Sequence, residues 1–320
     1  KEKKVALIAG ITGQDGAYLA KLLLSKNYEV FGTSRDADLA NTSKLNRLNI
    51  KDKVKIVTTL PNDFRSICKT ILTIQPTEIY NLAGQSSVYL SFDQPVEAIE
   101  SIANSTVNWL EAIRLLDNKI KFFNAGSSEL FGNMQNLEAN ENTPFSPKSP
   151  YAVAKLTAYW YVRNYRDSYN LKCCTGIMSN HESPLRGERF VTKKIVSAAH
   201  AIKNGEMKFL LLGNINIYRD WGWSPDYVEA IHDMLTINKN WDDFIISSGK
   251  THSLKEFIEK IFLHAGLEAE KFIKIDKKLF RPNELIYSRL NPAKIKSELD
   301  WSSKCDFNEL TRKLFFEEIL

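Results

Sequence analysis

Short apolar runs alternate with longer amphipathic stretches from the start of the chain to about position 180. The runs are too short for helices and read as buried strands. They fall at positions 4–9, 29–33, 54–58, 78–82, 119–124 and 171–178. The stretches between them repeat apolar side chains at helical spacing, most clearly at 17–26, 63–74, 96–116 and 150–169. This alternation predicts an α/β fold: a doubly wound parallel sheet with helices on both faces.

The pattern changes after about position 180, where prolines punctuate loops and the predicted helices, 254–264 and 307–318, are shorter. No flexible linker separates the two parts. We therefore expect one domain over residues 1–180 and a smaller mixed α/β domain over 181–320, packed directly together. Part of 218–248 is expected to return to the first domain.

A glycine cluster joins the first predicted strand to the first predicted helix, with the spacing GxxGxxG. The first glycine permits a tight turn, the second lets the backbone approach a pyrophosphate, and the third allows close packing of helix on strand. The helix N-terminus supplies free N–H groups to the phosphates. The cluster predicts a Rossmann-like dinucleotide site in the first domain. Its predicted contacts are Gly10, Thr12, Gly13, Gln14, Asp15 and Gly16.

The end of the second predicted strand bears on the choice of cofactor. A carboxylate here usually binds the ribose 2′-hydroxyl of NAD, whereas an arginine suits the 2′-phosphate of NADP. Ser34 stands where the acid is expected and Arg35 follows, which favours NADP. Asp36 is one residue further along and keeps NAD open as the less favoured alternative.

Tyr151 and Lys155 form a YxxxK pair at the start of a predicted helix. Spacing of i, i+4 places both side chains on one face. A phenol with a pKa near 10 is a poor base at neutral pH, and a nearby ammonium lowers that pKa. Tyr151 is therefore predicted to take a proton from a substrate hydroxyl while hydride leaves the same carbon.

Ser127 and Glu129 follow the fifth predicted strand, at the edge of the sheet where ligands bind in open α/β folds. Ser127 can donate a hydrogen bond to the reacting oxygen. Oxidation of a sugar hydroxyl needs only Tyr, Lys and Ser. A carboxylate beside them suggests a second proton transfer, at a carbon made acidic by the new ketone. The plainer alternative is that Glu129 caps a turn.

Composition and the remaining motifs exclude several classes. The 320 residues carry 43 Lys+Arg against 38 Asp+Glu, a scattered surplus of +5 that does not predict a nucleic-acid partner. Every apolar run is too short for a transmembrane helix, so no membrane span is expected. The four cysteines include no CxxC pair and the five histidines no metal-binding pattern, so we expect a reduced cytoplasmic protein without a metal.

Taken with these motifs, the sequence resembles the extended short-chain dehydrogenase/reductases, and among them the GDP-mannose 4,6-dehydratases. The resemblance covers nearly the whole chain. The segments that carry it are Gly10–Gly16, Tyr80–Ser86, Ser127–Leu130, Ser149–Lys155, Asn180–Pro184, Phe190–Lys194, Arg219–Gly222 and Arg281–Glu284. It implies oxidation at C4 of a GDP-sugar, removal of the C5 proton by Glu129 with loss of the 6-hydroxyl as water, and hydride return to C6.

The resemblance also implies roles for residues that the patterns alone do not single out. Ser127 takes the place of a threonine, and Ser128 matches a family serine, so Glu129 would serve as acid as well as base. The further cofactor contacts are Leu82, Ala83, Ser86, His181 and Arg186, beside Arg35, Tyr151 and Lys155. The implied substrate contacts are Ser86, Ser127, Glu129, Asn180, Val191, Lys194, Arg219, Arg281 and Glu284. Residues 181–320 would then be mainly the sugar-nucleotide domain.

Some positions depart from the family pattern. A second family arginine is replaced by Asp36, and two family histidines are replaced by Ser87 and Trp223, which could reshape the sugar pocket. The substrate is expected to be GDP-mannose or a related GDP-sugar, with a GDP-heptose or an amino-sugar nucleotide as alternatives. An epimerase or reductase on the same scaffold and a catalytically silent nucleotide sensor also remain. The family suggests a homodimer or homotetramer.

Overall fold

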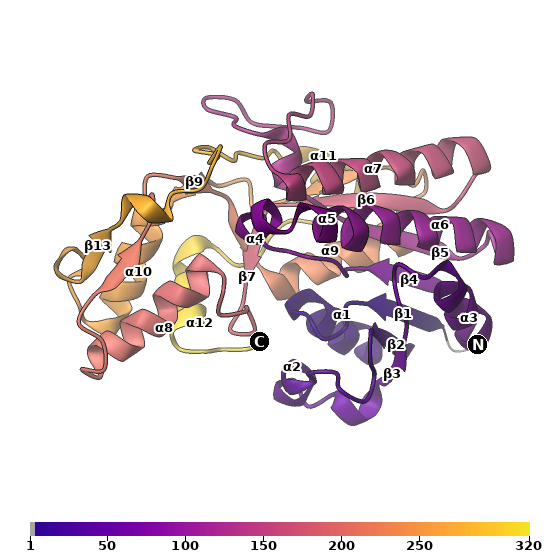
Figure 1. Ribbon diagram of the computed structural model, residues 1–320, viewed down its shortest axis with the longest axis horizontal. Helices are drawn as coiled ribbons and strands as arrows, with labels where there is room; N and C mark the ends of the chain where they lie inside the picture. The colour runs from indigo at the N-terminus through magenta and orange to yellow at the C-terminus, as the bar shows by residue number, and fades with distance from the viewer. Residues whose placement is uncertain (1–3) are drawn as a thin grey trace.

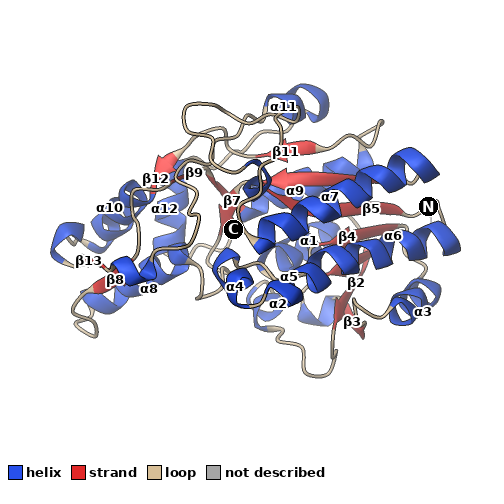
Figure 2. Ribbon diagram, turned by 45° about the horizontal axis from the view of Figure 1, so that its top comes forward, coloured by secondary structure: helices blue, strands red, loops and turns tan. Residues whose placement is uncertain are grey.

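A seven-stranded parallel sheet forms the centre of the larger part of the molecule (Figures 1 and 2). The computed structural model describes residues 4–320. The sheet runs in the order β11-β6-β5-β4-β1-β2-β3. Its strands are β1 (Val5–Ala9), β2 (Glu29–Ser34), β3 (Lys55–Thr58), β4 (Glu78–Asn81), β5 (Lys121–Ser127), β6 (Cys173–Met178) and β11 (Phe244–Ile246). The predicted fold class is confirmed, and the strand order reverses between β1 and β4, where ligands bind in this architecture.

Helices cover both faces of this sheet, as the alternation of apolar positions in β1 requires. Ala6 and Ile8 point into the core shared with α1 (Gln14–Ser25) and α9 (Ser224–Thr236). Leu7 and Ala9 point into the opposite core. The helices over that second face are α3 (Phe64–Ile74), α6 (Ser105–Leu116) and α7 (Pro150–Tyr169). Both faces of the strand are therefore dry, which explains its continuous apolar run.

Shorter helices complete the first half of the chain. They are α2 (Ser43–Arg47), α4 (Val88–Asp93) and α5 (Pro95–Ala98). The single helix predicted for 96–116 is observed as α5 and α6 joined by a π-helical segment, Ile99–Asn104. Figure 2 shows α4 and α5 beside α7, near the middle of the molecule.

A second lobe lies at the left of Figure 1, beyond the carboxyl ends of the strands, and has its own apolar core. Its helices are α8 (Val191–Lys203), α10 (Leu254–Ala265) and α12 (Phe307–Phe315). Small two-stranded sheets pair β8 (Leu210–Leu212) with β13 (Ile273–Ile275), and β9 (Tyr218–Arg219) with β12 (His252–Ser253).

The chain crosses between the two lobes more than once. β7 (Asn180–Glu182) pairs with β10 (Trp221–Trp223) in the region between them. Directly after β10, α9 returns to pack on α1, and β11 then joins the edge of the large sheet. The short helix α11 (Ala293–Leu299) packs beside β11. Within residues 4–320, no helix is long and apolar enough to cross a membrane.

Candidate active site

The glycine turn is built so closely that side chains cannot enter it. A Cβ placed on Gly16 would lie 2.2 Å from the Gly10 carbonyl oxygen. Gly10 adopts φ +87°, and its Cβ would lie 3.0 Å from Leu82 and Ala83 backbone atoms. The turn is thereby pressed between α1 and the loop after β4, where Leu82 and Ala83 were predicted to touch the cofactor. The first N–H groups of α1 remain available for phosphates, so this turn fits a dinucleotide pyrophosphate.

Asp15, at the start of α1, is bound to His181 from β7. His181 Nε2 lies 2.6 Å from Asp15 Oδ2, and Nδ1 lies 2.7 Å from the Ser179 carbonyl oxygen. Although burial raises the pKa of Asp15, His181 and hydrogen bonds lower it to about 2. The hydroxyl of Ser224, at the start of α9, donates to Asp15 at 2.8 Å. Gln14 adds a contact to the His181 carbonyl at 3.1 Å.

The structure shows how the two charged residues after β2, Arg35 and Asp36, are engaged, which the sequence alone could not decide. Arg35 is exposed, and its side chain has no hydrogen bond or ion pair within residues 4–320. Asp36 instead turns back on its own loop, where Oδ1 accepts from the N–H groups of Asp38 at 3.0 Å and Leu39 at 3.2 Å. The carboxylate is thus partly committed to holding the loop.

The predicted catalytic group meets where β5 ends and α7 begins. Ser127 is the last residue of β5, and its hydroxyl forms a hydrogen bond with the phenol of Tyr151. The same Oγ accepts from the Glu129 N–H at 3.2 Å. Lys155 is 8% exposed, and its Nζ donates to the Ala125 carbonyl at 2.7 Å.

The ionisation of the tyrosine differs from the sequence-based expectation. Burial raises the pKa of Tyr151 to about 12, although the hydrogen bond with Ser127 lowers it. Burial also lowers the pKa of Lys155 to about 8. The ammonium is held on Ala125, 5.8 Å from the centre of the Tyr151 ring, so it does not offset the cost of burying a phenolate here. The expected lowering of the Tyr151 pKa by Lys155 is therefore not seen in the protein alone.

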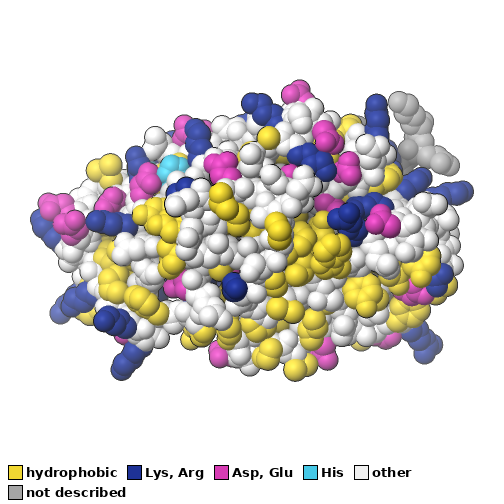
Figure 3. All heavy atoms as spheres, turned by 90° about the horizontal axis from the view of Figure 1, so that it is seen from above, with side chains coloured by type: hydrophobic (Ala, Val, Ile, Leu, Met, Phe, Trp, Pro, Cys, Tyr) yellow, Lys and Arg dark blue, Asp and Glu magenta, His cyan; other side chains and the backbone are white. Residues whose placement is uncertain are grey.

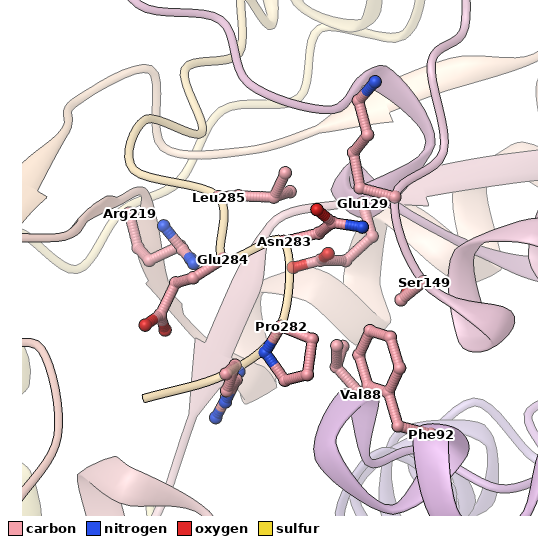
Figure 4. Close-up of a pocket in the computed structure, with 11 residues that line it drawn as sticks. Val88, Phe92, Glu129, Ser149, Arg219, Pro282, Asn283, Glu284 and Leu285 are labelled. Carbon is pink, nitrogen blue, oxygen red and sulfur yellow. The ribbon is translucent and has the colours of Figure 1, made fainter. Parts of the chain in front are cut away.

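A pocket beside these residues brings together charged side chains from distant segments (Figure 4). Glu129 faces Arg219, which lies on β9, and Arg281 and Glu284 from a loop of the second lobe. Burial lowers the pKa of Arg219 and raises that of Glu284. No two of these four side chains come within ion-pair distance in the described chain, and Arg219 donates only to its own neighbour, the Tyr218 carbonyl. Guanidinium donors therefore remain free for an anionic ligand such as a diphosphate.

Other predicted residues lie outside this pocket. Lys194 is exposed and donates to the Leu211 carbonyl at 3.1 Å. Arg186 lies 3.2 Å from the Glu182 carboxylate and stacks 3.7 Å from the Phe190 ring centre. Ser128 is buried at the start of a 3-10 turn. The pocket lining also excludes Ser86, Asn180 and Val191.

Trp223, which the sequence analysis expects could reshape the sugar pocket, lies outside the lining of this pocket. It is 4% exposed in the core of the second lobe, where the Lys313 ammonium lies 5.2 Å from its ring centre. Ser87 also lies outside the pocket lining and caps α4, with its hydroxyl accepting from the Leu90 N–H at 3.2 Å.

Some pocket residues were missed by the sequence reasoning. Val88 and Phe92 of α4 form an apolar wall, and Lys148 lines the same pocket. Ser149 and Asn283 stand inside motifs that carried the resemblance, which was the one available signal. Val88 and Phe92 had none, because apolar residues on a short helix read as ordinary core.

The glycine turn, the Ser-Tyr-Lys group and the pocket between two lobes define an extended short-chain dehydrogenase/reductase, which binds a nicotinamide nucleotide. Solved structures agree on the fold. A dTDP-glucose 4,6-dehydratase from Bacillus anthracis in complex with NAD superimposes with a TM-score of 0.84 at 20% identity, covering 98% of this chain and 96% of that one. A Thermus thermophilus UDP-glucose 4-epimerase complex with NAD gives 0.83 at 24% identity, covering 98% and 100%.

Sequence comparison gives the particular family. Residues 7–314 match the family described as GDP-mannose 4,6 dehydratase. GDP-mannose 4,6 dehydratase 1 of Arabidopsis thaliana is 42% identical, over 100% of this chain and 91% of that protein. The human GDP-mannose 4,6 dehydratase is 39% identical, over 100% and 92%. The chain belongs to the GDP-mannose 4,6-dehydratase family.

Proposed function

We propose that this protein converts GDP-mannose to its 4-keto-6-deoxy form, using bound NADP. The observation that carries the proposal is the position of Glu129. Its backbone N–H is bonded to Ser127, the partner of Tyr151, while its side chain lines the pocket that holds Arg219 and Arg281. A carboxylate in that position can act on a sugar whose diphosphate is held by the two arginines. It supplies a base next to the oxidising centre, which an epimerase or reductase does not use.

The reaction follows from these side chains. Tyr151 takes the proton of the sugar 4-hydroxyl, with Ser127 hydrogen-bonded to the same oxygen. When bound, an oxidised nicotinamide adds a positive charge to the site, accepts hydride from C4 and later returns it to C6. The C4 ketone acidifies the C5 proton, which Glu129 removes. Glu129 then gives that proton to the departing 6-hydroxyl, so water leaves. After the hydride returns to C6, a proton from solvent is delivered to C5 through Glu129, and Tyr151 releases to solvent the proton that it took from the 4-hydroxyl, which completes the 4-keto-6-deoxy sugar.

The choice of NADP over NAD is supported by the end of β2. Arg35 is free to meet a 2′-phosphate, while Asp36 Oδ1 is already bonded to two backbone N–H groups of its own loop. A carboxylate so engaged is poorly placed to accept from two ribose hydroxyls as well. We also propose that residues 1–180 mainly bind the cofactor and 181–320 mainly the sugar nucleotide, because Arg219, Arg281 and Glu284 come from the second part.

We further propose that the protein works as a homodimer or homotetramer. Helix α7 exposes Val153, Trp160 and Tyr161 by 48%, 50% and 42%, at spacings that share one helix face. Hydrophobic side chains are grouped on the face seen in Figure 3, with charged side chains around them. A grouped apolar surface of this kind is typical of a contact with another chain. Light scattering tests the proposal, which a monomer at working concentration would contradict.

The test of the dehydratase assignment is Glu129→Gln, which keeps the shape of the side chain and removes its basicity. With GDP-mannose and NADP, the variant should still oxidise C4, seen as NADPH absorbance, and should release no dehydrated product by mass spectrometry. Glu270→Gln serves as a matched control, because it makes the same change at an exposed glutamate of the second lobe, outside the pocket lining. Full dehydratase activity in Glu129→Gln would overturn the role assigned to this carboxylate.

A further inference from the structure

Lys44, which neither the motifs nor the resemblance singled out, lies against the glycine turn. It belongs to α2, and its Nζ donates to the Thr12 carbonyl at 3.2 Å. Thr12 lies between the first two glycines of the turn, so this long-range hydrogen bond places the Lys44 ammonium beside the glycine turn. The neighbouring Leu45 and Leu48 are buried at 0% and 2% exposure in the core shared with α1, which fixes the position of α2.

The ammonium of Lys44 has donors to spare and no counter-ion. An ammonium has three donors, and the Thr12 carbonyl is the one acceptor that the described chain gives it. No carboxylate within residues 4–320 forms an ion pair with it. Partial burial lowers the pKa of the lysine. A half-buried, unpaired cation is costly in a folded protein, and an anionic ligand would remove that cost.

The position of Lys44 selects which phosphate it would meet. In the sheet, Ala9 of β1 stands beside Thr33 of β2, so the glycine turn and the end of β2 leave the sheet side by side. The pyrophosphate is expected to bind the N–H groups at the start of α1. Lys44 instead donates to a carbonyl of the turn and comes from the segment that follows β2. In this architecture the ribose 2′ group is bound on the side of the turn next to the end of β2.

We propose that Lys44 is a cofactor-specificity residue, whose ammonium joins Arg35 in pairing with the 2′-phosphate of NADP. The proposal rests on the use of NADP proposed above. Two cations in place of a ribose-binding carboxylate make the site selective, because only NADP carries the extra dianion. Lys44 would supply one positive charge from α2, and the exposed guanidinium of Arg35 would supply the other from the end of β2.

The test measures the dissociation constants of NADP and NAD separately, by calorimetry on the full chain without substrate. Lys44→Gln keeps a donor for the Thr12 carbonyl and removes the charge, and it should weaken NADP binding about 10-fold, the scale of one charge-assisted hydrogen bond. NAD binding should change less than about 2-fold, since NAD lacks the phosphate. Lys44→Arg should retain the preference. Lys53→Gln, an exposed lysine nearby, is the matched charge control and should alter neither value.

Three results would overturn the proposal. Equal weakening of both cofactors by Lys44→Gln would assign the lysine to the pyrophosphate or to the fold, and thermal melting of the unliganded variant separates these two cases. No change in either dissociation constant would mean that Lys44 contacts no phosphate. A wild-type protein that prefers NAD would refute the NADP proposal itself, whatever the Lys44 variants do.

Discussion

His181 and Asp15 are 2.6 Å apart, joining the first turn of α1 to a strand between the two lobes. Both ring nitrogens of His181 face acceptors, since Nδ1 points at the Ser179 carbonyl. An imidazole with acceptors on both sides is best satisfied when doubly protonated. Although burial opposes this, Asp15 raises the pKa of His181 above its usual value. The contact therefore ties the cofactor turn to the strand between the two lobes, and it is an ion pair when His181 is protonated.

This ion pair predicts a pH dependence of stability. Because the folded pKa of His181 is raised, its contribution to the free energy of unfolding is complete below the unfolded pKa, near 6.5, and is lost as pH rises through the folded pKa. Asp15, with a folded pKa of about 2, loses its contribution only as pH falls below the usual range of a carboxyl. Stability of the wild type to urea should therefore decline above the unfolded pKa of histidine, and His181→Asn should lack that decline.

A second buried acid provides the internal check. Burial raises the pKa of Asp220 to about 6, so its penalty develops between about pH 4 and 6 and is shared by both proteins. The free energies of unfolding of wild type and His181→Asn should therefore change differently with pH only above the unfolded pKa of histidine. Parallel stability curves across that window would show that His181 is uncharged in the folded protein.

Ser127 should control the ionisation of Tyr151. The hydrogen bond between them lowers a tyrosine pKa that burial otherwise raises, so Ser127→Ala should move the alkaline-rising limb of kcat/KM to higher pH. Loss of this bond to a developing phenolate should also reduce the rate roughly 10- to 100-fold at neutral pH. Ser127→Thr, which retains the hydroxyl, should restore both. A pH profile in Ser127→Ala that matches the wild type would show that the hydroxyl does not act through Tyr151.

Gly16 should tolerate no side chain. In Gly16→Ala the new methyl would lie 2.2 Å from the Gly10 carbonyl oxygen and 2.7 Å from Ile11 Cα, both backbone atoms. The turn must shift, at a cost of about 1–3 kcal/mol in unfolding free energy, and cofactor binding should be lost with it. Gly187→Ala is the control for stability, because its methyl would come no closer than 3.7 Å to the Phe190 ring. Equal melting temperatures for the two variants would contradict this view of the turn.

Arg35 should determine cofactor preference. Arg35→Ala removes an exposed guanidinium that has no partner in the described chain, so folding should be unaffected and NADP binding should weaken about 10-fold. NAD binding should be nearly unchanged. Arg65→Ala removes another exposed arginine, at the start of α3, and is the matched control. Weakened binding of both cofactors in Arg35→Ala would place the guanidinium away from the 2′-phosphate.

Most of the sheet could be predicted from sequence because its central strands β1, β4, β5 and β6 are buried on both faces. Each of the six predicted runs is a strand of the sheet. The seventh, β11, is a very short strand, Phe244–Ile246, and it pairs with β6 from much earlier in the chain. Too short for periodicity to show, it could be expected only as part of a longer segment returning to the first domain.

The part of the site that lies on one helix could also be predicted, because residues at a fixed spacing on a helix are close together in space. Tyr151 and Lys155 share a helix face at fixed spacing, so their proximity is local and readable. The pocket depends on Glu129 meeting Arg219 and Arg281, which come from much later in the chain, and no local pattern encodes such a meeting. Charges are harder still: the high pKa of Tyr151 arises from burial, which depends on the complete fold.

The most direct test of the dehydratase account uses GDP-mannose carrying deuterium at C4, incubated with the purified wild-type protein and NADP. A 4,6-dehydratase should give a product that is lighter by one water and retains the deuterium, now at C6, because the hydride leaves and returns within one turnover. Solvent deuterium should enter at C5 in a parallel incubation. A product of unchanged mass, or one without the C4 label, would contradict the account.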